Sequence, residues 1–145
     1  LQKGRPFYLK ARPPLSKAES EAAGIPRFLN SAGAVPFLFN VDGLADADQV
    51  LICEGESDTL TALSFGYVAV GIPGWNHFKA EWSNLFRSRT VFVVLDADKA
   101  GAAGVRDIAS KFQANGLPLP KQVILPAGQD LNEFLTSGRT EGRNE

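Results

Sequence analysis

The sequence contains a single cysteine, a single histidine and no methionine. Cys53 has no partner for an internal disulfide bond, which fits a reducing compartment. Zinc sites combine several Cys and His side chains, so we expect no zinc site around His77, the one histidine. The chain begins at Leu1 and lacks methionine, and we therefore expect it to be a piece of a longer protein.

Long apolar runs are also missing. None approaches the ~20 residues that span a bilayer, and no secretory signal pattern opens the sequence. Hydrophobic residues make up 44% of the chain and charged residues 21%, which is typical of a globular protein. Its 145 residues suffice for one domain with a core and a small appendage. We expect a cytoplasmic protein that does not associate with membranes.

Basic and acidic residues are divided unevenly along the chain. Up to Val41 there are six basic and two acidic residues, whereas nine basic and fourteen acidic residues follow. A basic segment attracts a phosphate backbone, and an acidic part binds metal ions that neutralise it. The division favours an enzyme that handles polynucleotides, with an ordinary solvated surface as the alternative.

Apolar runs alternate with amphipathic segments after residue 48. Runs rich in Val, Ile and Leu are typical of buried parallel strands, and they occur at residues 50–53, 67–70, 90–95 and 123–125. Helices are expected between them, at residues 57–65, 78–86 and 99–113. The alternation predicts an α/β fold: an open, mainly parallel sheet with flanking helices.

Proline and polar segments divide the chain into three parts. Residues 1–44 form a basic amino-terminal part, with extended pieces at 7–9 and 37–39 and a helix at 16–23. Residues 45–138 form the α/β domain. Residues 139–145 are polar, and we expect a frayed, flexible tail.

Acidic residues follow the apolar runs where strands should end. Glu54 comes directly after the first run. Asp96 and Asp98 follow the third, and Asp130 follows the last. Ligands of open α/β sheets collect at the carboxyl ends of the strands, so these side chains should converge. Because carboxylate oxygens suit Mg²⁺ or Mn²⁺, the sequence predicts a site for a divalent metal and phosphate.

Three motifs carry a family resemblance: EGESD at residues 54–58, DADKAG at 96–101 and GQDLNEFL at 128–135. Their order and separation resemble the Toprim domain of bacterial and phage-type primases, type IA and type II topoisomerases, and certain nucleases. The upstream segment IPRFLNS, at residues 25–31, resembles the segment that precedes Toprim in bacterial and phage primases. The resemblance therefore implies the catalytic core of a phage or mobile-element primase.

A primase core makes RNA primers on a single-stranded DNA template from ribonucleoside triphosphates, with Mg²⁺ or Mn²⁺ and beside a replicative helicase. Joining nucleotides needs carboxylates that hold metal ions, and Asp96, Asp98 and Asp130 are the candidates. Glu54 is either a further ligand or the group that manages the hydroxyl proton.

Three basic residues are candidates for contact with nucleic acid or nucleotide. Arg12 and Arg27 belong to the basic amino-terminal part, and Lys99 directly follows the second acidic motif, where a solvated lysine is the alternative. Supporting roles are expected for Gly55, Gly101 and Asp58: close backbone approach for the two glycines, and capping or bracing of a helix for the aspartate.

Two other functions remain open at this point. A Toprim nuclease or topoisomerase fragment would use the same acids, and a Toprim-like module could bind nucleic acid without catalysis. The complete acid set argues against the binding module, which has no need to gather carboxylates beside phosphates. The IPRFLNS segment argues against the nuclease and topoisomerase, and Tyr8 and Tyr67 lie in predicted strands, unsuited to a covalent DNA link.

Overall fold

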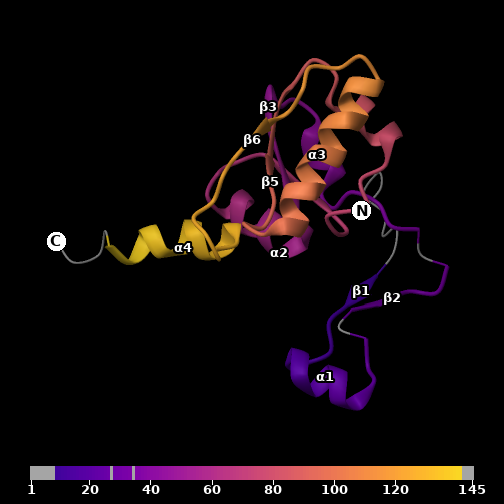
Figure 1. Cartoon of the computed structure of the whole chain (residues 1–145), viewed down its shortest axis with the longest axis vertical. Coiled ribbons are helices and arrows are strands. Elements are labelled where there is room, and N and C mark those ends of the chain that lie inside the picture. The colour runs from indigo at the N-terminus through magenta and orange to yellow at the C-terminus, as the bar shows by residue number, and fades with distance from the viewer. Residues whose placement is uncertain (1–8, 27, 34, 142–145) are drawn as a thin grey trace. The chain divides into compact units, whose positions relative to one another are not determined.

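The computed structural model describes residues 9–26, 28–33 and 35–141. Its contacts divide the chain into two units, Leu1–Pro36 and Phe37–Glu145, whose elements are labelled in Figure 1. In the described part of both units, no helix is long and apolar enough to cross a membrane.

The first unit contains one pair of short strands and one helix among its described residues. β1 (Lys10–Ala11) pairs antiparallel with β2 (Leu29–Asn30). α1 (Lys17–Ala23) follows Ser16, whose hydroxyl accepts the backbone N–H of Glu19. The Glu19 carboxylate in turn accepts the backbone N–H of Ser16. This capping box fixes the start of the helix where the sequence predicts it.

The second unit is built around a four-stranded parallel sheet. Its strands are β3 (Gln49–Glu54), β4 (Ala69–Ile72), β5 (Thr90–Val94) and β6 (Lys121–Gln122). They lie in the order β4-β3-β5-β6, so β3 and β5 are the inner strands. The predicted α/β fold with a parallel sheet is confirmed.

Helical elements cover both faces of this sheet (Figure 1). One face carries α3 (Lys99–Ala114) and the 3-10 helix η2 (Ala80–Phe86). The other face carries α2 (Gly55–Ser64) and the start of α4 (Leu131–Glu141). Since successive side chains of a strand point to opposite faces, Ile52 joins the first core and Cys53 joins the second.

Aromatic rings fill the core on the α3 face. The Phe78 ring lies 5.8 Å from Trp82, 6.3 Å from Phe86 and 6.0 Å from Phe112, measured between ring centroids. Each of these side chains is at most 3% exposed. Burying a side chain of this size contributes about 1.5–3 kcal/mol, so the aromatic core holds α3 and η2 firmly against the sheet.

The amino-terminal boundary differs from the predicted one. Residues 37–44 pack with the second unit, because Leu38 and Leu44 are buried in its core and Phe39 pairs with Gly71. The short 3-10 helix η1 (Val41–Leu44) forms within this stretch.

The carboxyl-terminal elements also differ. The last strand, predicted at residues 123–125, is β6 at Lys121–Gln122. Ile124 is 83% exposed, which no inner strand position would be. α4 continues to Glu141, into the segment expected to fray, and residues 142–145 lie outside the described part of the chain.

Candidate active site

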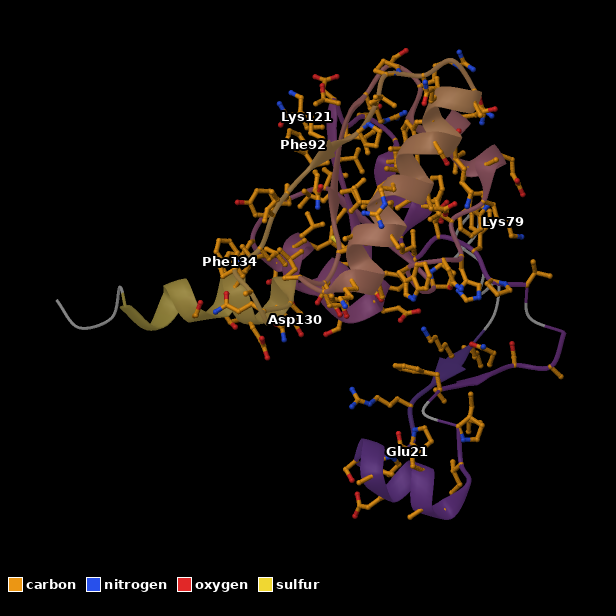
Figure 2. The ribbon with its side chains drawn as sticks, viewed as in Figure 1. Glu21, Lys79, Phe92, Lys121, Asp130 and Phe134 are labelled. Atoms are coloured by element: carbon orange, nitrogen blue, oxygen red, sulfur yellow. The ribbon has the colours of Figure 1, made fainter. Side chains whose placement is uncertain are left out.

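The predicted acids stand at the junctions between strands and the helices that follow them. Glu54 is the last residue of β3 and directly precedes α2. β5 runs parallel to β3 with Val94 opposite Cys53, so Asp96 leaves the sheet at the same edge. Asp130 directly precedes α4, where Figure 2 labels it. The parallel sheet thus brings these distant residues to one edge, as predicted.

Glu54 is half-buried among other carboxyl groups. Burial, followed by the charge of Asp96, raises its pKa from 4.5 to about 7, and Asp98 adds to the rise. The backbone N–H of Asp96 donates to the Glu54 carboxylate and opposes the rise. With a pKa near neutrality, this side chain can both accept and release a proton at physiological pH.

Asp58 and Asp96 carry the same kind of perturbation. Burial and the charge of Asp130 raise the pKa of Asp58 from 3.8 to about 6. Burial raises the pKa of Asp96 as well, followed by the charges of Asp130 and Asp98. Glu54, Asp58 and Asp96 therefore each lie in the field of neighbouring carboxylates. These three groups and the carboxylates that act on them define the acidic cluster: Glu54, Asp58, Asp96, Asp98, Asp130 and Glu133.

Two members of the acidic cluster also hold helix starts. Asp98 is the N-cap of α3, and its Oδ1 accepts the backbone N–H of Gly101 at 2.7 Å. The Oδ1 of Asp130 accepts the backbone N–H of Glu133 in the first turn of α4, also at 2.7 Å. Capping fixes each carboxylate with one oxygen and leaves the other for a ligand.

Two glycines shape the backbone at the edge of the sheet where the acids lie. A Cβ at Gly101 would lie 2.1 Å from the carbonyl oxygen of Asp96, so only glycine lets α3 begin this close to the acid, as predicted. Gly55 serves differently from the predicted close approach: its φ of +84° is the left-handed conformation, and a Cβ would meet nothing within 4 Å.

Gly71 was not singled out by the sequence, yet a Cβ there would lie 2.5 Å from the carbonyl oxygen of Gly55. It therefore lets β4 pack closely against the start of α2. A Pro-Gly turn just beyond it, at residues 73–74, is the nearest signal in the sequence and points to the following loop instead.

A family model described as Toprim-like matches residues 51–135. The chain belongs to the Toprim-like family. The Gene 57 protein of Mycobacterium phage D29 is a relative of this chain. The two are 31% identical over 116 residues, which are 79% of this chain and 73% of the relative. The resemblance drawn from the three motifs is confirmed.

Solved primase structures share this Toprim-type fold. The Aquifex aeolicus primase, with its zinc-binding and RNA polymerase domains, matches with a TM-score of 0.73 and 24% identity over 97% of this chain and 36% of that chain. The primase fragment of the bacteriophage T7 primase-helicase matches with a TM-score of 0.65 and 23% identity, over 79% of this chain and 50% of that one. The chain thus spans half or less of these primases, and the likeness establishes the fold.

The acidic cluster of this Toprim-like chain has the donor chemistry of a divalent-metal site. All its donors are carboxylate oxygens, the ligands that Mg²⁺ and Mn²⁺ prefer. Across residues 9–141, as far as they are described, no group of three or more acidic, His or Cys side chains is already placed to hold a metal ion. The assignment of Glu54, Asp96, Asp98 and Asp130 as metal ligands stays a prediction.

The predicted basic contacts are distributed over both units. Lys99 is the first residue of α3 and is exposed beside Asp98. Arg12 is exposed in the first unit, directly after β1. Arg27 lies outside the described residues. Their contacts with nucleotide or nucleic acid stay predictions.

Asp58 braces a helix other than its own. It is 5% exposed within α2, and its carboxylate accepts the backbone N–H of Asn132 in α4. Asn132 was not singled out by the sequence. The D-x-N spelling at residues 130–132 was the available signal.

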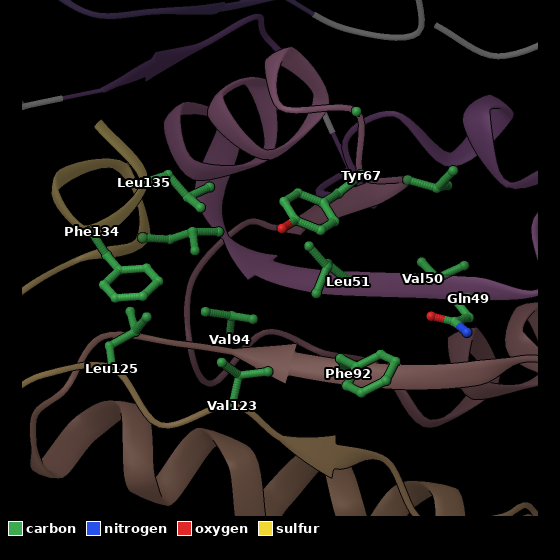
Figure 3. A pocket seen from close by; sticks show the side chains of 13 residues that line it. Gln49, Val50, Leu51, Tyr67, Phe92, Val94, Val123, Leu125, Phe134 and Leu135 are labelled. Atoms are coloured by element: carbon green, nitrogen blue, oxygen red, sulfur yellow. The ribbon is translucent and has the colours of Figure 1, made fainter. Parts of the chain in front are cut away.

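A cavity of about 470 Å³ opens on the sheet face that α2 and α4 cover in part (Figure 3). Figure 3 shows Leu51 and Phe92 from the strands and Phe134 from α4 among the side chains around it. Its lining is almost entirely apolar and includes no member of the acidic cluster. The cavity is therefore separate from the candidate active site.

Proposed function

We propose that this chain is a catalytic-core fragment of a DNA primase that makes RNA primers on single-stranded DNA at the replication fork, in the cytoplasm. The observation that supports it best is the acidic cluster at the carboxyl edge of a Toprim-like sheet. The solved structures that share the fold add support, since one of them is a complex of the T7 lagging-strand DNA polymerase and primase domains with an RNA/DNA hybrid and dTTP.

The residues of the acidic cluster match what nucleotide joining requires. A 3′ hydroxyl attacks the α-phosphate of a ribonucleoside triphosphate, the new P–O bond forms, and pyrophosphate leaves. Glu54, which ends β3 beside these acids, is suited to accept the hydroxyl proton. Asp96, Asp98 and Asp130 would hold Mg²⁺ or Mn²⁺, which stabilises negative charge on the attacking and leaving oxygens.

The basic residues would hold the polymers and the nucleotide. Arg12 and Arg27, in the basic first unit, would contact the phosphate backbone of the template. Lys99, at the start of α3, would contact the triphosphate. A replicative helicase is the proposed partner, because the T7 neighbour is a primase-helicase.

The test is extension of a short RNA annealed to a single-stranded DNA template, with Mg²⁺ or Mn²⁺ and ribonucleoside triphosphates. Glu54→Gln should reduce extension by at least ~100-fold and leave DNA binding unchanged, since it removes the proton acceptor and preserves the shape. Glu81→Gln, at an exposed position in η2, is the matched control and should keep full activity.

The same reactions without ribonucleotides separate primase from nuclease. Metal-dependent cutting of the labelled template, lost in Glu54→Gln and accompanied by no RNA extension, would replace the primase proposal with a nuclease.

A further inference from the structure

α2 and α4 are joined by a side-chain hydrogen bond between residues 71 positions apart. The hydroxyl of Thr61 donates to Oδ1 of Asn132 at 2.9 Å. The bond is partly buried, and Thr61 lies one turn after Asp58 on the same helix. Asn132 contacts both residues: its backbone N–H donates to Asp58, and its side chain accepts from Thr61.

These contacts fix the first turn of α4 against α2. Asp130 belongs to that turn, because its Oδ1 caps the backbone N–H of Glu133 at 2.7 Å. Leu131, the next residue, is buried in one core with Cys53 and Val94, which lie just before the strand ends that carry Glu54 and Asp96. The place of Asp130 in the acidic cluster therefore depends on where Asn132 is held.

We propose that Thr61 and Asn132 form a clamp between α2 and α4 that positions Asp130 beside Asp96 and so sets the affinity of the acidic cluster for a divalent cation. The proposal rests on the proposed metal-dependent function. Neither residue is a metal ligand in it, and both are positioning residues that act through Asp130.

The chemistry of an amide explains why asparagine suits the clamp. Its oxygen accepts the Thr61 hydroxyl without adding charge beside Asp58 and Asp130. A carboxylate at this position could accept the same hydrogen bond, but it would add a further negative charge to a crowded site. Asn132→Asp should therefore keep the hydrogen bond and alter the electrostatics.

The central experiment compares Mn²⁺ binding by Thr61→Val and Thr61→Ser, measured by the electron paramagnetic resonance of free Mn²⁺. Valine keeps the branched shape and the helix propensity of threonine but lacks the hydroxyl, whereas serine keeps the hydroxyl. Loss of a residue that orients a metal ligand typically weakens binding by 10–100-fold. We expect Thr61→Val to bind Mn²⁺ about 10-fold more weakly and Thr61→Ser to bind nearly as wild type does.

Thr136→Val is the matched control, since the Thr136 hydroxyl donates to backbone carbonyl oxygens of its own helix, α4. It should leave Mn²⁺ affinity unchanged. Hydrogen exchange of the backbone amides at residues 130–136 measures, in the absence of metal, how firmly the start of α4 is held. Thr61→Val should speed this exchange. Asn132→Ala, which also lacks the side-chain acceptor, provides a second variant if Thr61→Val does not fold.

The outcomes separate the clamp from the proposed function. Equal Mn²⁺ affinity in wild type, Thr61→Val and Asn132→Ala overturns the clamp, provided that Asp96→Asn with Asp98→Asn abolishes binding. Lower thermal stability in Thr61→Val with unchanged Mn²⁺ affinity shows a merely structural bond and overturns it too. If wild type binds no Mn²⁺, the metal site of the proposed function fails and the clamp fails with it.

Discussion

Replacing Glu54 with glutamine should stabilise the metal-free protein near pH 8 and leave its stability unchanged near pH 4. Burial and the charge of Asp96 raise the pKa of Glu54 from 4.5 to about 7 in the folded chain. Below the lower value the group is protonated in both the folded and the unfolded states and contributes nothing. As the pH rises toward the upper value, the unfolded chain releases its proton first, and the free energy of unfolding falls.

The expected gain follows from the same values. A gap from 4.5 to about 7 corresponds to roughly 3 kcal/mol for a fully buried group. Glu54 is half-buried, and water and salt screen the charges around it, so we expect a gain of roughly 1 kcal/mol near pH 8. For a chain of this length, that gain raises the midpoint of thermal unfolding by about 3 °C.

Thermal unfolding followed by circular dichroism, in the presence of a chelator, measures this gain near pH 4, 6 and 8. Glu81→Gln serves as the control for loss of an exposed charge. A Glu54→Gln protein that is less stable than wild type near pH 8 would refute the reasoning, because ionised Glu54 would then make a net favourable contact. A gain that is equal at all three pH values would refute it as well.

Gly101→Ala should destabilise the fold by about 3 kcal/mol in urea unfolding, because the new Cβ would lie 2.1 Å from the carbonyl oxygen of Asp96. A loss under about 0.5 kcal/mol would show that α3 can shift away at little cost. Arg12→Ala should weaken binding to single-stranded DNA and lower the slope of log affinity against log salt by about 1 in fluorescence anisotropy. An unchanged slope would indicate that Arg12 belongs to an ordinary solvated surface.

The inner strands and the long helix could be predicted because burial determines their sequence pattern directly. β3 and β5 lie between helical layers, so their residues are apolar on both faces and stand out as continuous runs. α3 presents Ile108 and Phe112 to one core, and this spacing is visible in the sequence. The acids that follow these strands were then placed correctly, because parallel strands end at one edge of the sheet.

The edge of the sheet and the contacts between helices could not be predicted in this way. β6 is an edge strand next to Pro118 and Pro120, and it pairs with another strand on one side only. The apolar run at residues 123–125 therefore does not coincide with the residues that pair in the sheet. The bond between Thr61 and Asn132 joins two polar residues that are far apart in sequence. No periodic pattern in the sequence predicts such a contact, because the contact depends on how α2 and α4 lie on the sheet.

Carboxylates without a cation lower the stability of the fold, so other parts of the chain must hold them in place. On the face of the sheet that α3 covers, the rings of Phe78, Phe86 and Phe112 lie within 6.3 Å of one another. β3 connects the two regions, because Ile52 is buried in this aromatic core and Glu54 ends the same strand. The core therefore fixes the strand end whatever the charge at its tip. Glutamine in place of Glu54 should change the charge and the proton without moving the backbone, and a loss of nucleotide joining in that variant can be attributed to the missing carboxylate.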